Sequence, residues 1–214
     1  MNWRAIDKMT ENLNIISYSG GADSTAVLVY CRENDVPYAE VVYSEDWFPY
    51  PGTYMTDYFK YIEKKFDIKI TWLKNDRGYW IKRNGGHFPR LPHPYCCRIK
   101  STIIGNYLKE KYGKSGLNII MGIRRRESGR RSKYLESGDW YWNQRLGVNY
   151  QYWYPIFQFI DAKHYCNIHH VKINPLYDIH GVRRLGCHKC YKVGDFRWKP
   201  VDEQQKSLEK WITI

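Results

Sequence analysis

The sequence predicts an α/β fold, with a mostly parallel sheet and helices on both faces of that sheet. Short apolar segments alternate along the chain with longer segments of helical periodicity, an order typical of strands joined by right-handed helical crossovers. A glycine-rich turn directly follows the first apolar segment, at the end of a strand where such sheets bind ligands. With 214 residues, 43% of them hydrophobic and 26% charged, the chain has the size and composition of one globular domain.

Each element is predicted from a local pattern of residues. Tyr54, Tyr58, Ile62 and Phe66, for example, recur at helical spacing in a segment that Pro51 opens. The expected strands lie at residues 14–17, 39–44, 68–73 and 117–122, and the expected helices at 23–34, 53–66, 98–112 and about 160–168.

Two stretches lack a regular pattern. Residues 75–95 are rich in Gly, Pro and His, which predicts a loop. Residues from about 135 to 214 are aromatic and cysteine-rich, and we expect them to be irregular apart from the helix near residue 160. Because no repeat, low-complexity run or linker is visible, we expect residues 1–214 to form a single domain.

The charge of the chain points to a polyanionic partner. Lysine and arginine number 34 against 22 acidic residues, which gives a net charge of +12 and favours nucleotides or nucleic acid. Aromatic residues make up 17% of the chain and can stack on bases as well as fill a core. No stretch reaches the roughly 20 apolar residues of a membrane helix, and the first 14 residues are too polar for a signal peptide. We therefore expect a cytoplasmic protein with no membrane partner.

Residues 17–24 (SYSGGADS) form the strongest candidate for a binding site. They lie between the first strand and the first helix, where backbone N–H groups and the helix N-terminus can hold an anion. Two adjacent glycines allow a close backbone approach, and Ser19 and Ser24 add hydroxyl donors. Asp23 could cap the helix or help to bind Mg²⁺ carried by the phosphates. The segment lacks the Walker lysine, so it is not a P-loop; the alternative is a plain glycine-rich turn capped by Asp23.

A second candidate follows the fourth expected strand. Residues 122–131 (GIRRRESGRR) carry five arginines at the point where a parallel sheet presents its ligand. Guanidinium groups suit phosphate and sulfate oxygens. A solvated basic loop would explain the charges alone.

These motifs resemble those of the PP-loop, or N-type, ATP pyrophosphatases and the PAPS (phosphoadenosine phosphosulfate) reductase superfamily. SGGADS is similar to their SGGxDS signature, residues 122–131 to GIRxxES…R, and residues 173–190 (INPLYDIHGVRRLGCHKC) to NPLYD…G…GCxxC. The resemblance covers residues 13–191 and implies an adenine-nucleotide alpha-hydrolase-like (Rossmann-like) fold. One departure is visible: the family often has Asp-Thr-Gly after the second strand, where this chain has Glu45, Asp46 and Trp47.

The resemblance assigns roles residue by residue. It implies binding of ATP with Mg²⁺, or of PAPS or its relative APS, and ATP cleavage between the α and β phosphates. The residues implied in nucleotide or phosphate binding are Ser17, Ser19, Gly20, Gly21, Asp23, Ser24, Gly122, Arg124, Glu127 and Ser128, and those implied in catalysis are Asp23, Ser24, Arg124 and Arg131.

Four of the six cysteines form two pairs with the chemistry of a metal site. Cys96 and Cys97 are adjacent, and Cys187 and Cys190 form a CxxC. Adjacent thiolates suit the several irons of a cluster better than one ion, and CC…CxxC resembles the 4Fe-4S ligand set of APS reductases and of DNA-phosphorothioation proteins. A 4Fe-4S cluster is the prediction, with zinc or unliganded thiols as alternatives. The remaining cysteines, Cys31 and Cys166, are expected to be packed thiols.

Sulfonucleotide reductases use a further cysteine near the C-terminus as nucleophile. No cysteine follows Cys190, so reduction would need Cys166 or a partner's thiol in its place. This favours ATP chemistry: adenylation of an acceptor oxygen in a tRNA or DNA, followed by sulfur transfer. Four thiolate ligands would leave no open iron, so the sulfur would come from elsewhere, such as a cysteine desulfurase. PAPS or APS reduction, with a thiol reductant, is the alternative, and a non-catalytic nucleotide-binding subunit a further one. The chain could also form a homo-oligomer.

Overall fold

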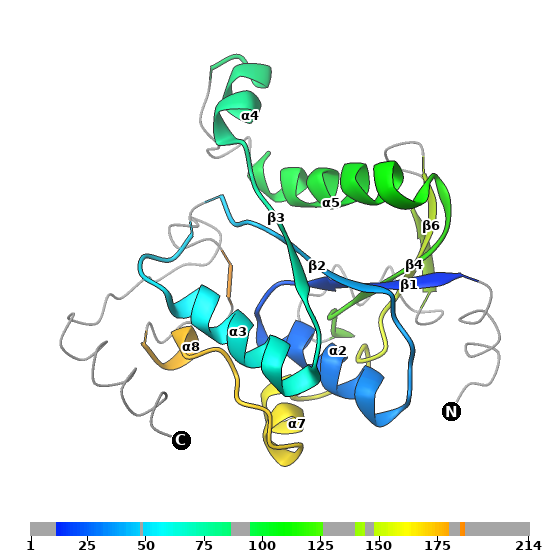
Figure 1. Cartoon of the computed structure of the whole chain (residues 1–214), viewed down its shortest axis with the longest axis vertical. Coiled ribbons are helices and arrows are strands. Elements are labelled where there is room, and N and C mark those ends of the chain that lie inside the picture. The colour runs from blue at the N-terminus through cyan, green and yellow to red at the C-terminus, as the bar shows by residue number, and fades with distance from the viewer. Residues whose placement is uncertain are drawn as a thin grey trace.

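The computed structural model describes residues 12–47, 49–86, 95–125, 140–143, 148–179 and 185–186. These residues contain a six-stranded sheet of order β3-β2-β1-β4-β6-β5 (Figure 1). The strands are β1 Leu13–Tyr18, β2 Glu40–Ser44, β3 Ile70–Leu73, β4 Ser115–Met121, β5 Trp140–Asn143 and β6 Asn149–Trp153. The helices are α2 Ala22–Glu33, α3 Tyr54–Phe66, α4 Arg77–Arg83, α5 Cys96–Tyr112, α7 Ala162–Ile168 and α8 Leu176–Ile179. All four predicted strands and all four predicted helices are present, each bound within two residues of its predicted place.

The sheet confirms the predicted fold class. Strands β3, β2, β1, β4 and β6 are parallel, and β5 is an antiparallel strand at the edge beside β6. The chain moves outward from β1 to β2 and β3, and then crosses back over β1 to form β4. Because crossovers are right-handed, this reversal places α2 and α3 on one face and α5 on the other (Figure 1). The carboxyl ends of β1 and β4 therefore flank the point where the strand order reverses, which is the usual ligand site of such sheets.

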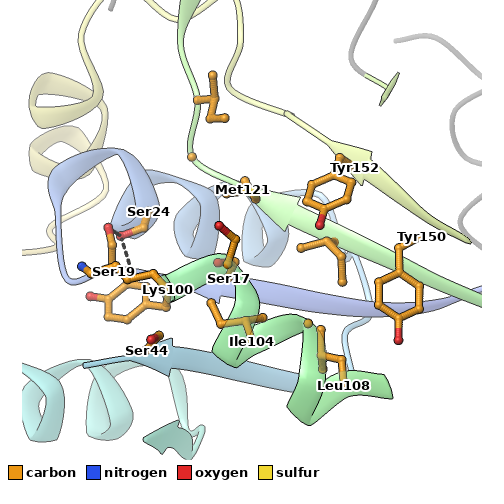
Figure 2. Close-up of a pocket in the computed structure, with 16 residues that line it drawn as sticks. Ser17, Ser19, Ser24, Ser44, Lys100, Ile104, Leu108, Met121, Tyr150 and Tyr152 are labelled. Atoms are coloured by element: carbon orange, nitrogen blue, oxygen red, sulfur yellow. Dashed lines mark hydrogen bonds between the residues drawn. The ribbon is translucent and has the colours of Figure 1, made fainter. Parts of the chain in front are cut away.

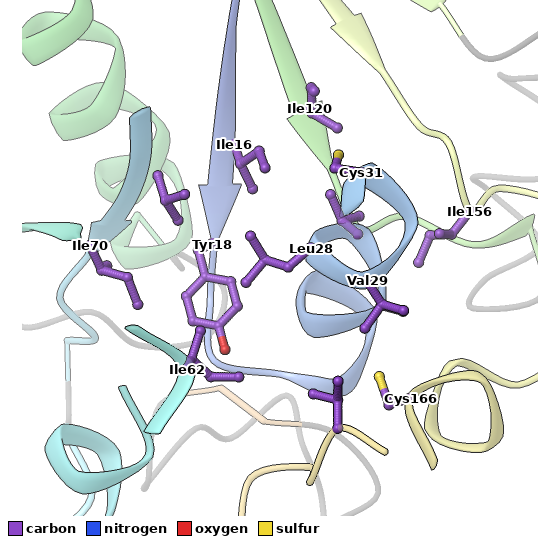
Figure 3. Close-up of a cluster of buried hydrophobic side chains, with 14 of the residues drawn as sticks. Ile16, Tyr18, Leu28, Val29, Cys31, Ile62, Ile70, Ile120, Ile156 and Cys166 are labelled. Atoms are coloured by element: carbon purple, nitrogen blue, oxygen red, sulfur yellow. The ribbon is translucent and has the colours of Figure 1, made fainter. Parts of the chain in front are cut away.

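Alternation along the strands builds a core on each face. In β1, Ile16 and Tyr18 point toward α2, α3 and α7, whereas Ile15 points toward α5. The first of these cores is the larger and includes Leu28 of α2 and Ile62 of α3, both fully buried (Figure 3). The sheet is thus covered on both faces, as the apolar runs of its central strands predict.

The expectation of a loop from residue 75 to 95 is wrong for its first part, which forms helix α4. The carboxylate of Asp76 accepts a hydrogen bond from the N–H of Tyr79 at 2.9 Å and so caps the first turn. Trp80 and Ile81 pack against the buried cluster around Trp47. A cap and a tertiary contact therefore stabilise a seven-residue helix that the flanking Gly and Pro residues disguise in the sequence.

The part of the chain expected to be irregular contributes two strands and a short helix. Strand β6 lies between β4 and β5 inside the sheet, and its Tyr150 and Trp153 are buried. The aromatic run of residues 140–154 is therefore partly sheet core. That the chain is one domain stays a prediction.

A buried carboxylate fastens α5 to the sheet, at the end opposite the candidate site. Glu40, the first residue of β2, accepts hydrogen bonds from Thr71 at 2.5 Å, Tyr107 at 2.6 Å, Tyr112 at 2.8 Å and Lys111 at 3.1 Å. Burial acts to raise the pKa of Glu40, but these four donors together lower it below its ordinary value.

Replacing this carboxylate should destabilise the protein in a pH-dependent way. Glu40→Gln removes the charge and sets an amide donor against other donors, so we expect a loss of about 1–3 kcal/mol in the free energy of unfolding at pH 7. Because the folded-state pKa is depressed, the wild-type advantage is complete above pH ~5 and declines as the pH falls below about 4. Urea unfolding of both proteins at several pH values measures this difference in the free energy of unfolding. Glu110→Gln, at an exposed position of the same helix, is the control; equal losses in both variants would contradict this role.

Candidate active site

The glycine-rich turn closes tightly between β1 and α2. Gly20 adopts a φ of +73°, a conformation that suits glycine, and Gly21 is the N-cap residue of α2. The hydroxyl of Ser24 donates to the carbonyl of Gly21 at 2.9 Å and lies 3.1 Å from the hydroxyl of Ser19. The N–H groups of Asp23 and Ser24 belong to the first helical turn and so lack intrahelical acceptors. Together with the serine hydroxyls, they form a set of donors suited to an anion.

Asp23 does not cap the helix. Gly21 takes the N-cap position, with no side-chain cap, and the carboxylate of Asp23 instead forms an ion pair with Nε of Arg124 at 2.5 Å. The Nη1 of Arg124 also donates to the carbonyl of Ile160 at 2.9 Å. These two bonds leave other N–H donors of the five on the guanidinium for a ligand. The pair therefore fixes an arginine at the edge of the glycine-rich turn of residues 17–24, which we call the phosphate loop after its predicted role.

Gly122 lets the end of β4 touch the first turn of α2. A Cβ atom built on Gly122 would lie 2.5 Å from the carbonyl carbon of Asp23 and 2.7 Å from the backbone nitrogen of Ser24. No side chain fits at such distances. The close backbone contact thus requires a glycine at this position, and it brings residues 122–125, the described part of the second candidate segment, to the first turn of α2.

Two residues of the NPLYD segment hold the phosphate loop from outside. The fully buried Asn174 donates from Nδ2 to the carbonyl of Gly20 at 3.2 Å, and the N–H of Ala22 donates to the hydroxyl of Tyr177 at 2.9 Å. The sequence resemblance singled out both residues, but without a role. The structure shows that they fix the loop's conformation.

A pocket of about 400 Å³ lies between the sheet and α5, at the carboxyl ends of β1, β2 and β4 (Figure 2). Four predicted residues line it, namely Ser17, Ser19, Ser24 and Gly122. Side chains that sequence reasoning missed also line it, namely Ser44, Lys100, Ser101, Ile104, Leu108, Met121 and Tyr152. Several of these residues belong to α5, which is distant in sequence from residues 17–24. Their shared position therefore depends on the path of α5 across the sheet, which no local sequence pattern shows.

Polar and apolar groups are divided within this pocket. Ser44, at the end of β2, is buried, and its hydroxyl has no hydrogen-bond partner within the described residues. Lys100 forms an ion pair with the buried carboxylate of Asp46. The pocket wall formed by α5, β4 and β6 is largely apolar. One end of the pocket thus suits phosphates, and the interior suits a flat, partly apolar group.

The loop that departs from the family pattern is engaged in contacts within the protein. Glu45 lies 3.8 Å from Arg77, Asp46 pairs with Lys100, and Trp47 is buried against α5. These three side chains tie the ends of β2 and β3 to helices α4 and α5. Ser44, one residue earlier, is the side chain of this segment that lines the pocket.

The cysteines fall into two groups. Cys31 and Cys166 are buried, which confirms the expected packed thiols, and burial raises the pKa of each thiol to about 12. Cys166 is therefore poorly suited to act as a nucleophile at neutral pH. Cys96 begins α5 and is buried beside Trp47 and Ile99. Among the described residues, no group of three or more His, Cys, Asp or Glu side chains could hold a metal ion.

Several predicted site residues lie outside the described part of the chain. They are Glu127, Ser128, Arg131, Cys187 and Cys190, together with the side chain of Cys97. Their assignments stay predictions. In the described residues, no helix is both long and apolar enough to span a membrane.

Comparison with known proteins decides the family. The sequence model of the phosphoadenosine phosphosulfate reductase domain matches residues 13–193. The chain belongs to this family. The match covers the phosphate loop, the residues that line the pocket and the NPLYD segment, so the whole candidate site lies within the matched domain. No curated protein matches the sequence.

Solved structures of distant relatives share the fold. A PAPS reductase from Candida auris in complex with phosphate has a TM-score of 0.57 at 14% identity, over 81% of each chain. An FMN adenylyltransferase from Candida glabrata in complex with ATP has a TM-score of 0.57 at 12% identity, over 93% of this chain and 71% of that one. The U34-tRNA thiolase NcsA of Methanococcus maripaludis, with its [4Fe-4S] cluster, has a TM-score of 0.52 at 11% identity, over 94% and 65%. At these identities the likeness establishes the PP-loop fold alone.

Gly122 provides a test of the site's construction. Gly122→Ala forces a Cβ against the backbone of α2, and we expect it to cost about 1–3 kcal/mol of stability and to weaken nucleotide binding. Urea unfolding and ATP titration measure the two effects. Gly78→Ala is the matched control, because its Cβ would meet only a side-chain oxygen at 3.5 Å; a Gly122→Ala protein as stable as Gly78→Ala would show that β4 and α2 are not in close contact.

Proposed function

We propose that this member of the PAPS reductase family is an ATP pyrophosphatase that adenylates an oxygen of a nucleic acid and so prepares it for sulfur transfer. The observation that carries the proposal is the phosphate loop, which lines a nucleotide-sized pocket and lies against an arginine fixed at the end of β4. A distant relative in complex with ATP supports it.

The chain's own groups can divide the work along the nucleotide. The first-turn N–H groups of α2 and the hydroxyls of Ser19 and Ser24 would bind the β and γ phosphates. Arg124, oriented by Asp23, would stabilise the charge that develops on pyrophosphate as it leaves. Mg²⁺ carried by ATP would neutralise phosphate charge and polarise the reacting phosphorus. Asp23 is the carboxylate in the first turn of α2 and would be the side chain available to bind this ion.

The pocket would hold the adenosine. Its apolar wall on α5 suits the base, and the buried hydroxyl of Ser44 supplies a hydrogen-bonding group inside it. Lys100, paired with Asp46, would place a cation at the phosphate end. An acceptor oxygen then attacks the α phosphorus, the bond to pyrophosphate breaks, and a sulfur nucleophile finally displaces AMP.

A nucleic acid is the acceptor that the charge favours. The chain carries +12, and the NcsA neighbour is a tRNA thiolase. A tRNA base or a DNA phosphate each offers an oxygen that can be adenylated. The sulfur would arrive as the persulfide of a cysteine desulfurase. Once its outer sulfur has displaced AMP, a thiol reductant would cleave the S–S bond and leave the sulfur on the acceptor.

The cysteine pairs fit a 4Fe-4S cluster in their donor chemistry. Cys96 lies in an apolar cluster at the N-terminus of α5, where the helix dipole favours negative charge. Cys96, Cys97, Cys187 and Cys190 would be the ligands. When bound, such a cluster would supply a redox-active or structural centre beside α5, and zinc is the alternative occupant.

Sulfonucleotide reduction is the second candidate function. Family membership and the PAPS reductase neighbour favour it, because PAPS or APS would occupy the same pocket as ATP. The reaction needs a nucleophilic thiol. Cys166 is fully buried, so a partner's thiol would have to supply it. A purely regulatory nucleotide-binding role, without turnover, is the third.

The first test measures pyrophosphate. With ATP, Mg²⁺ and a tRNA or DNA acceptor, the protein should release pyrophosphate, and Arg124→Gln should slow that release by about 100-fold. Arg125→Gln, whose side chain is exposed, is the control for lost charge and should stay active. Absence of ATP binding together with PAPS-dependent sulfite release would overturn the proposal in favour of reduction. ATP binding without turnover would favour the regulatory role.

The second test measures metal. Protein purified without oxygen should contain about four irons and four acid-labile sulfides per chain, and Cys96→Ser should lose most of both. Cys31→Ala, which alters a packed thiol of α2, should keep them. Zinc in place of iron would contradict the cluster.

A further inference from the structure

Helix α4 presents one face to the protein and another to solvent. Trp80 and Ile81 face inward, against the cluster of Trp47 and the first turn of α5. Tyr79, Lys82 and Arg83, spaced at i, i+3 and i+4, share the opposite face and are all exposed. Figure 1 shows α4 standing clear of the sheet, beyond the N-terminal end of α5. We call Tyr79, Lys82 and Arg83 the outer face of α4.

The outer face combines an exposed ring with a guanidinium group. Tyr79 is 51% exposed, and Nη1 of Arg83 donates to its hydroxyl at 2.7 Å. The guanidinium carbon of Arg83 lies 5.9 Å from the ring centre of Tyr79 and 5.7 Å from that of Trp80. An aromatic ring and a guanidinium held together at the surface form the kind of platform on which unpaired bases stack.

The charge around this platform is positive. Residues 74–86 contain four cations and a single acid, Asp76. The carboxylate of Asp76 is engaged in capping α4, and Arg77 is engaged with Glu45. Lys74, Lys82 and Arg83 are exposed residues, and the side chain of Arg77 is 41% exposed beside Glu45. Such a set of cations suits a phosphate backbone.

We propose that the outer face of α4 binds single-stranded nucleic acid, with bases stacked on Tyr79 and phosphates paired with Lys82 and Arg83. This rests on the proposed function and supplies its acceptor site. A duplex would keep its bases away from the ring, so an unpaired segment such as a loop is the ligand. An acidic peptide could pair with the cations, but it has no base to stack on the ring of Tyr79.

The position of α4 suits this role. It follows the carboxyl end of β3, and its base is tied to Glu45: the N–H of Asn75 donates to the Glu45 carboxylate at 3.2 Å, and Arg77 lies 3.8 Å from it. Glu45 comes directly after Ser44, which lines the pocket. A strand held on α4 therefore lies at the same edge of the sheet as the nucleotide pocket.

Fluorescence anisotropy with the full chain tests the proposal. The probes are labelled 20-nucleotide single strands of mixed-sequence RNA and DNA, a labelled duplex, and a labelled poly-glutamate peptide. We expect a single strand to bind most tightly, with an affinity that falls as salt rises. Tyr79→Ala should weaken binding by about 5-fold or more, whereas Tyr79→Phe, which keeps the ring, should restore most of it. Lys82→Ala with Arg83→Ala should weaken binding and flatten the salt dependence.

Matched controls separate this surface from general charge. Lys60→Ala removes a 76% exposed lysine on α3, and it should bind as the wild type does. Unchanged affinity in Tyr79→Ala, or tighter binding of the duplex or of poly-glutamate, would overturn the proposal. ATP binding is titrated on the same wild-type protein. If no ATP binds but oligonucleotide binding depends on Tyr79, the adenylation chemistry is contradicted and this surface is supported.

Discussion

The contact between two backbones at Gly122 is the constraint on which the candidate site depends. The end of β4 lies against the first turn of α2 at distances that admit no side chain. That contact lets Arg124, two residues further on, reach Asp23 on α2. It also brings the loop after β4 to the phosphate loop. The reversal of strand order places the carboxyl ends of β1 and β4 side by side. Gly122 allows the segments that follow these two strands to come into contact.

Three carboxylates, each paired with a lysine or an arginine, stabilise this arrangement of helices around the sheet. Glu40 joins α5 to the sheet at one end, Asp46 joins α5 to the end of β2, and Asp23 joins α2 to the loop after β4. Each of these acids is matched by one lysine or arginine, so the three pairs are neutral and the net charge of +12 belongs to the rest of the chain.

Sequence predicted what is local and missed what depends on distant contacts. The strands, the phosphate loop and Gly122 carry strong local signals, namely apolar runs, paired glycines and a motif. Helix α4 was missed because it depends on a cap at Asp76 and on packing against Trp47, which is distant in sequence. Ser44 and Lys100 could not be predicted as pocket residues for the same reason: the pocket that both line forms only where α5 crosses the sheet. The placement of β6 beside β4 likewise depends on a pairing across more than 20 residues of chain.

The hold of Asn174 and Tyr177 on the phosphate loop spans about 155 residues of chain. Such a long-range contact forms late, after the cost of closing a long loop has been met. During synthesis, the turn at Gly20 and Gly21 therefore emerges from the ribosome long before the residues that fix its shape. The turn can take the conformation described here only after Asn174 and Tyr177 have been synthesised.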